Sequence, residues 1–154
     1  MTMHSKMKKI LTGLIFVGAM ALLAGCGGNK AQMLQQLEQL ELQNRSGEPM
    51  LNDSLAEDLV SYFDRHGDAN ERMRSRYILG RTYYCLGELP RALETYYEAA
   101  DCADTTATDC NFKVLSRVYG QGSTVFYDQV QPRSQLEMLR QARYYAKSSA
   151  RTDL

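Results

Sequence analysis

The sequence is poor in the residues from which many active sites are built. It contains no tryptophan, three prolines and two histidines, and beyond His4 the only imidazole belongs to His66. A catalytic nucleophile needs a base that a third group orients, and a zinc site needs several closely spaced His or Cys ligands. The sequence therefore predicts a non-catalytic protein without a metal site or a cofactor. His66 is expected to be a solvated cation at the end of a helix.

The first 25 residues have the pattern of an export signal. Three lysines among the first nine residues precede an uncharged apolar run over residues 10–23. A basic start followed by a short apolar centre is typical of a secretory signal. The run is shorter than the roughly 20 residues that a helix needs to cross a bilayer, and no basic cluster follows it. The sequence therefore predicts a cleaved signal peptide over residues 1–25.

The tetrad Leu23-Ala24-Gly25-Cys26 ends this segment and resembles the lipobox of bacterial lipoproteins. The resemblance implies cleavage before Cys26 and attachment of diacylglycerol to its thiol. Since two or three acyl chains anchor a protein far better than one, we expect lipid on Cys26 to hold the chain to a membrane. Gly27 is not the aspartate that commonly retains lipoproteins in an inner membrane. The expected location is therefore the outer membrane, with the protein facing the periplasm.

The charges of the mature chain are nearly balanced. Residues 1–25 hold three of the 18 basic side chains and none of the 18 acidic ones, which leaves 15 basic against 18 acidic residues and a net charge of −3. So mild a net charge gives no reason to expect a nucleic-acid partner, and it indicates no polybasic membrane patch. The mature chain is long enough for one domain with a modest core.

Three cysteines remain after Cys26, namely Cys85, Cys102 and Cys110. Export would make disulfides chemically accessible. Cys102 and Cys110 are the candidate pair, and closing so short a loop would stabilise the fold by roughly 2 to 3 kcal/mol. The alternative, two free thiols in a polar loop, stays open.

Helical spacing of apolar residues runs through most of the mature chain, which predicts an all-α fold. An amphipathic helix is expected over residues 31–43, ended by the Gly- and Pro-containing stretch 44–49. Asp53 or Ser54 is expected to cap the next helix, and Pro90 fits the first turn of a later one. The expected segments are a tether at residues 26–30, an amphipathic helix and linker at 31–52, helical repeats at 53–147 and a tail at 148–154.

The stretch from Met73 to Asp104 contains the clearest repeat. Gly80 would let two helices approach closely, Gly87 would end the first helix, and small residues would lie where the second helix crosses it. These residues have the spacing of a tetratricopeptide repeat, which the stretch resembles: Leu79-Gly80, Tyr83, Gly87, Ala92, Tyr96 and Ala99. Two positions depart from the family pattern, since Arg76 replaces a large apolar residue and Asp104 replaces the closing proline.

The resemblance continues more weakly on both sides and covers residues 54–147. A shift of 34 residues back places Leu59 and Tyr62 at matching positions, so residues 53–65 would belong to a preceding repeat. A shift of 43 residues forward finds a degenerate second repeat, with nine extra residues in the loop 102–110. Its matching residues are Phe126, Leu136, Glu137, Leu139 and Ala142. The resemblance implies antiparallel helix-turn-helix repeats that form a short α-solenoid.

The candidate binding residues are Arg74, Tyr77, Arg81, Tyr84, Arg117 and Tyr127. The first four are spaced three, four and three apart and so form one stripe on a helix. The resemblance implies that this stripe faces a concave groove that holds a peptide or a partner helix. It also gives Arg117 and Tyr127 the positions of Arg74 and Tyr84 in the second repeat. Arg and Tyr often dominate binding at interfaces, but in the alternative view the tyrosines only pack between repeats.

The resulting hypothesis is a membrane-tethered helical-repeat module that binds an unidentified protein or peptide. The family's carboxylate clamp has Lys and Asn where Tyr77 and Arg81 stand, which argues against a C-terminal carboxylate as the ligand. Because repeat arrays usually need about three units, dimerisation with a second copy is a further option. Two alternatives stay open. One is a shortened extracytoplasmic sensor of a larger repeat-bearing regulator. The other is a glycan-uptake accessory lipoprotein, although the absence of tryptophan argues against it.

Overall fold

The computed structural model describes residues 29–152, which fall into two parts, 29–36 and 37–152. The first part is helical, and the second is a compact unit with its own core. No strand occurs among the described residues, which confirms the expected all-α class. The signal peptide expected at residues 1–25 and the proposed lipidation site, Cys26, lie outside the described residues.

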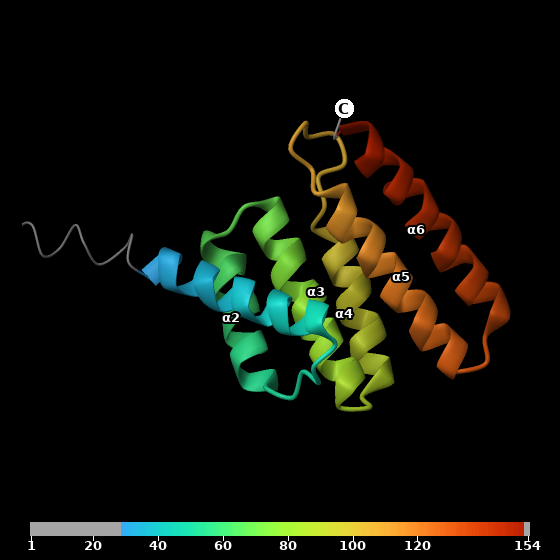
Figure 1. The fold of residues 1–154 in the computed structure, drawn as a ribbon, viewed down its shortest axis with the longest axis horizontal. Coiled ribbons are helices and arrows are strands. Elements are labelled where there is room, and N and C mark those ends of the chain that lie inside the picture. Colours follow the sequence, from blue (N-terminus) through green and yellow to red (C-terminus); the bar gives the residue numbers. More distant parts are fainter. Residues whose placement is uncertain (1–28, 153–154) are drawn as a thin grey trace, which may run out of the picture. The chain divides into compact units, whose positions relative to one another are not determined.

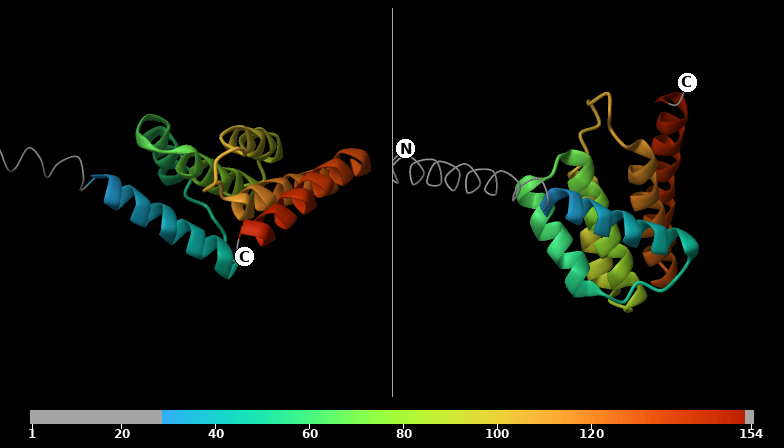
Figure 2. Two further views of the ribbon diagram at one scale, coloured as in Figure 1. Left: turned by 90° about the horizontal axis from the view of Figure 1, so that it is seen from above. Right: turned by 60° about the vertical axis from the view of Figure 1, so that its left-hand side comes forward.

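The compact unit begins with the helical residues 37–46, which we call the N-terminal segment. The helices that follow are α2 (Asp53–His66), α3 (Ala69–Cys85), α4 (Leu89–Asp101), α5 (Phe112–Asp128) and α6 (Pro132–Thr152). Each of them packs on the next in chain order, and α3 also contacts α5 (Figure 1). The pair α5 and α6 lies side by side, and the loop between α4 and α5 projects at one end of the helices (Figure 2).

The first helix is longer than its apolar pattern indicated. Residues 29–46 are helical, so residues 29 and 30 of the expected tether and residues 44–46 of the expected breaker all belong to it. The helix ends at Gly47, whose φ of 79° lies in the left-handed region that glycine adopts without strain. The prediction that residue 44 would already end the helix is therefore wrong, because the glycine and not the preceding polar residues stops it.

Two further helix ends differ from expectation. Asn52, rather than Asp53 or Ser54, caps α2, because its side-chain oxygen accepts a hydrogen bond from the Leu55 amide at 3.1 Å. At the other end of the unit, α6 runs to Thr152, so residues 148–152 of the expected tail are helical. The expected position of Pro90 in the first turn of α4 is confirmed.

Helices α3 and α4 pack closely at the small residues Gly80, Ala92 and Ala99, as the sequence analysis predicted. A Cβ added to Gly80 would lie 2.5 Å from the Tyr96 ring, well inside van der Waals contact. Ala92 and Ala99 are fully buried on α4, and Gly87 has a φ of 80° in the turn between the two helices. The expected close approach and the expected end of α3 are both confirmed.

The turn after α3 recurs 43 residues later, after α5. Gly87 occupies the left-handed position in the first turn, and Val130 occupies it in the second with a φ of 56°. The hydrogen bonds match as well, since Glu88 N donates to Tyr83 O and Gln131 N donates to Phe126 O, both at 2.9 Å. The two helix pairs therefore share one turn geometry, although a β-branched residue stands in the second where the first has glycine.

The contact inside the second pair is one residue out of register with the spacing of 43. Gly122 of α5 faces the Met138 side chain, whose methyl lies 3.1 Å from a built Cβ. Met138 is buried, whereas Leu136 and Leu139 are 49% and 45% exposed. Leu139 therefore does not take the place that Tyr96 has in the first pair. Met138 fills that place, because its flexible chain fits the gap beside Gly122.

Arg76, which departs from the repeat pattern, joins three helices through charge. Its guanidinium donates to both carboxylate oxygens of Asp64 on α2, with Nη2 at 2.9 Å from Oδ2, and its Nε lies 3.7 Å from Glu98 on α4. The pKa of Arg76 is raised by these acidic partners against the opposing effect of burial. A charged network stands here in place of the apolar contact that the family pattern uses.

Exposed basic residues are most numerous on α6. This helix carries Arg133, Arg140, Arg143, Lys147 and Arg151 but a single acidic residue, Glu137. The net charge of the whole chain does not show this local excess of positive charge. A sum over the whole chain averages α6 with acidic helices such as α2.

Candidate functional site

The part of the chain that the structure describes offers no group of His, Cys, Asp and Glu side chains that could hold a metal ion. His66 is exposed at the last position of α2, and its ring lies 4.8 Å from the Tyr62 ring, centroid to centroid. Within the described residues, no helix combines the length and the apolar character needed to cross a bilayer.

The stripe on α3 begins with Arg74, which is paired within the chain. Its Nε and Nη2 donate to the two carboxylate oxygens of Glu41 in the N-terminal segment, at 2.8 and 2.9 Å. This two-point geometry is the strong form of a charge-assisted hydrogen bond. The hydrogen bond to Glu41 raises the pKa of Arg74 above its ordinary value. Both side chains are largely shielded from solvent, at 20% and 15% exposed.

Asn44 makes the next contact, between the second and third residues of the stripe. Its Nδ2 donates to the Tyr77 hydroxyl at 3.2 Å, and its Oδ1 accepts from Arg81 Nε at 2.8 Å. Another nitrogen of Arg81, Nη1, donates to Gln121 on α5. The N-terminal segment thus contacts α3 through Asn44 and is linked through Arg81 to α5. Three of the expected groove residues are occupied by a helix of the same chain.

Tyr84, the last residue of the stripe, contacts α5 and not the N-terminal segment. Its hydroxyl donates to Asp128 at 2.8 Å, and the Arg81 guanidinium lies 5.3 Å from its ring centre. The hydrogen bond to Asp128 raises the pKa of Tyr84. Tyr84 therefore helps to join α3 to α5.

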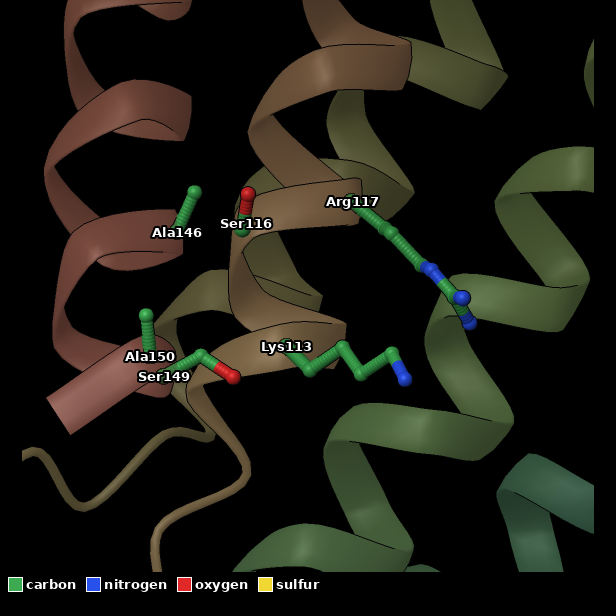
Figure 3. A pocket seen from close by; sticks show the side chains of 6 residues that line it. All are labelled: Lys113, Ser116, Arg117, Ala146, Ser149 and Ala150. Atoms are coloured by element: carbon green, nitrogen blue, oxygen red, sulfur yellow. The ribbon is translucent and has the colours of Figure 1, made fainter. Parts of the chain in front are cut away.

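Arg117 and Tyr127 lie on the same helix but in different places. Arg117 lines an open cavity of about 270 Å³ with Lys113 and Ser116 of α5 and Ala146, Ser149 and Ala150 of α6 (Figure 3). Tyr127 is 67% exposed and lines a different depression near the α5–α6 turn, with Val130 among its neighbours. The six candidate residues therefore do not form one site.

Lys113, which the sequence analysis did not select, forms a basic pair with Arg117. The two are four residues apart and point away from α6 in Figure 3. Both side chains are exposed, and neither is joined by an ion pair to an acidic side chain among the described residues. Their spacing of four on a predicted helix was the available signal, because it places both on one face.

Several tyrosines pack between helices, as the alternative view expected. Tyr77 and Tyr96 are buried with ring centres 6.4 Å apart. Tyr83 is also buried, and its hydroxyl donates to Glu57 of α2 and accepts from Arg91 of α4. Burial, followed by the hydrogen bond to Glu57, raises the pKa of Tyr83 to about 12. These aromatic residues build the unit, so the part of the site left for a partner is chiefly the basic pair.

Tyr96 has a buried hydroxyl without a hydrogen-bond partner of good geometry among the described residues. Burial raises its pKa, although the nearby Arg81 guanidinium opposes that shift. A buried, unsatisfied hydroxyl is destabilising. The Tyr96 ring lies beside the Tyr77 ring, and the Tyr77 hydroxyl accepts a hydrogen bond from Asn44 of the N-terminal segment.

Cys102 and Cys110, the candidate disulfide pair, are both free thiols, and so is Cys85. Burial raises the pKa of the Cys102 and Cys110 thiols. Asn70 holds the end of this loop instead, because its Nδ2 donates to Asp109 O and its Oδ1 accepts from Asn111 N, both at 2.9 Å. The loop is fixed to the start of α3 without a covalent bond.

The chemistry that this surface offers is recognition of carboxylates and amides by arginine. One arginine already holds a carboxylate of the chain, and the basic pair presents two further cations to solvent. Comparisons with protein-family models, curated proteins and solved structures found no match to this chain.

Proposed function

We propose that this chain is a lipid-anchored, non-catalytic adaptor, built from two tetratricopeptide-like helix pairs, that binds a helical segment of another protein. The repeat assignment is supported by the turns at Gly87 and Val130 and by the close contacts at Gly80 and Gly122. The lipobox-like tetrad before Cys26 supports attachment to a membrane, with the outer membrane and the periplasm as its location.

One observation carries the binding proposal: the stripe on α3 holds a helix. Arg74 binds the Glu41 carboxylate at two points, and Arg81 and Tyr77 bind the Asn44 amide. These contacts come from one face of the N-terminal segment, since residues 41 and 44 are three apart. A surface that binds one helix through a carboxylate and an amide has the chemistry to bind another of the same kind.

The free portion of this surface begins at the basic pair. Arg117 lies about one turn and Lys113 about two turns before Gln121 on α5, whose side-chain oxygen accepts a hydrogen bond from Arg81. The basic pair therefore continues the polar face past the N-terminal segment. A partner segment with acidic side chains one turn apart would place a carboxylate on each cation. Arginine favours two-point binding of such a group.

Site-specific photo-crosslinking in cells tests this proposal. A photoreactive amino acid at Lys113 is expected to capture a defined partner protein, whereas the same amino acid at Asp58, exposed on α2, is expected not to capture it. The substitution Arg117→Glu should then remove the adduct formed at position 113. Equal adducts at both positions, or an adduct that survives Arg117→Glu, would contradict binding at the basic pair.

The anchor is tested separately by metabolic labelling with a fatty acid. The wild-type chain should take up the label and fractionate with membranes, and Cys26→Ala should abolish both. Retention of the label in Cys26→Ala would rule out lipid on this cysteine. Because the crosslinking experiment reads the basic pair alone, either half of the proposal can fail without the other.

A further inference from the structure

The face of α6 opposite α5, its outer face, is exposed in the part of the chain that the structure describes. Within the compact unit α6 packs on α5 and on no other labelled helix. Leu136, Leu139 and Tyr144 are 49%, 45% and 59% exposed on the uncovered side. Exposed apolar residues that lie together on one face are candidates for an interaction surface.

All five cations of α6 lie on one narrow stripe of this face. At about 100° per residue, Arg133, Arg140, Arg143, Lys147 and Arg151 fall within roughly 80° of the helix circumference. With a rise of 1.5 Å per residue, the stripe is roughly 27 Å long. Leu136 lies inside the stripe, while Leu139 and Tyr144 lie on either side of it. The face is a basic, amphipathic surface.

These cations are almost unpaired within the chain. Arg140 lies 3.4 Å from Glu137, but both side chains are more than 60% exposed, and such pairs contribute little. The other four form no ion pair with an acidic side chain among the described residues. Five cations in one row repel each other, so a negatively charged surface alongside them would be favourable.

We infer that the outer face of α6 lies on the headgroups of anionic phospholipids. This inference rests on the proposed lipid anchor, which would keep a membrane surface within reach of α6. A long row of cations with a tyrosine and two leucines beside it suits a flat, negatively charged and partly apolar interface. It does not suit a second copy that stacks through α6 on α6, because like charges would then face each other.

Vesicle binding by the mature chain made without acylation tests the inference. Residues 37–152 form a compact unit, so removal of the first 25 residues leaves its core intact. The chain should sediment with vesicles that contain phosphatidylglycerol and stay in solution with phosphatidylcholine alone. High salt should release it. Equal binding to both vesicles would overturn the inference.

A matched pair of double variants locates the effect. Arg143→Glu/Lys147→Glu should weaken binding to phosphatidylglycerol vesicles at least tenfold, and Arg45→Glu/Arg65→Glu, with the same change in net charge, should leave it within about twofold. All four side chains are exposed. Equal losses in the two variants would show a diffuse charge effect and contradict a role for α6.

Sedimentation without vesicles, with and without duplex DNA, tests the two other possible partners of this face, a second copy of the chain and a nucleic acid. The wild-type chain should be monomeric and should show no retention of duplex DNA. If it self-associates or retains DNA, and Arg143→Glu/Lys147→Glu abolishes either property, α6 is a protein or nucleic-acid interface and the lipid assignment is wrong. None of these measurements depends on Lys113 or Arg117, so this inference and the proposed partner site fail independently.

Discussion

The guanidinium of Arg74 and the carboxylate of Glu41 form a two-point ion pair between residues 33 positions apart. Glu41→Gln should lower the free energy of unfolding by about 1 to 3 kcal/mol, because a shielded guanidinium loses its charged partner. Denaturant unfolding measures the loss. Hydrogen exchange should also become faster at residues 37–46.

Glu38→Gln is the control for this substitution. Glu38 is exposed and acts on Arg74 only through the longer-range field of its charge. Its removal should change stability by less than about 0.5 kcal/mol. If both variants have the same effect, the N-terminal segment is held by its apolar face, with Leu37 and Leu40, and not by the ion pair.

Gly80 and Gly120 should respond to alanine in opposite directions. A Cβ at Gly80 would lie 2.5 Å from the Tyr96 ring, so Gly80→Ala should destabilise by about 1 to 3 kcal/mol. A Cβ at Gly120 would meet no atom within 4 Å, and there alanine should stabilise α5 by about 0.5 to 1 kcal/mol. Thermal unfolding distinguishes the two. A stabilising Gly80→Ala would contradict the close approach of α3 and α4.

The turn after α5 should gain from a glycine. Val130 has a φ of 56° and is 84% exposed, so Val130→Gly removes backbone strain and little packing. Since the strain costs about 1 to 2 kcal/mol and glycine loses about 0.5 to 1 kcal/mol in entropy, a net gain near 1 kcal/mol is expected. The reverse change, Gly87→Val, should destabilise by a similar amount. Midpoints of chemical denaturation test both.

Loss of a tyrosine hydroxyl should cost stability at position 83 but not at 96. The Tyr83 hydroxyl joins Glu57 and Arg91, so Tyr83→Phe should destabilise by about 1 kcal/mol. The Tyr96 hydroxyl has no such partner among the described residues, so Tyr96→Phe should be neutral or stabilising. Destabilisation by Tyr96→Phe would show that the hydroxyl has a partner, such as the nearby Arg81 guanidinium or a bound water.

Alkaline pH should weaken the fold over a defined range. The pKa of Tyr83 is raised from the ordinary 10 to about 12 by burial and by its hydrogen bond to Glu57. Between these values the unfolded chain loses a proton that the folded chain keeps, so stability is complete below pH 10 and falls as the pH rises toward 12. Denaturant unfolding across this range should show a smaller loss for Tyr83→Phe.

The sequence predicted the local features of the fold well. Gly80, Gly87 and Pro90 each have a role that follows from backbone conformation or close packing, and such roles can be inferred from neighbouring residues. The length of α6 and the capping of α2 by Asn52 were missed, since several polar residues compete at each helix end.

The candidate site was harder to predict because its contacts are long-range. Leu37 and Leu40 indicate that the N-terminal segment buries a face, but their spacing does not say against which helix. The partners of Arg74 and Arg81 therefore could not be inferred from spacing. Arg76 likewise departs from the repeat pattern for a reason that appears only in space, namely Asp64 on another helix.

The position of the N-terminal segment also has a consequence for the order of folding. Helices α2 to α6 contact mainly their neighbours in the chain, so each helix pair can form early from local contacts. Residues 41 and 44, by contrast, precede Arg74 and Arg81 by 33 and 37 positions. Docking of the segment needs these long-range contacts, so it is expected to be a late step in folding, after α3 has formed.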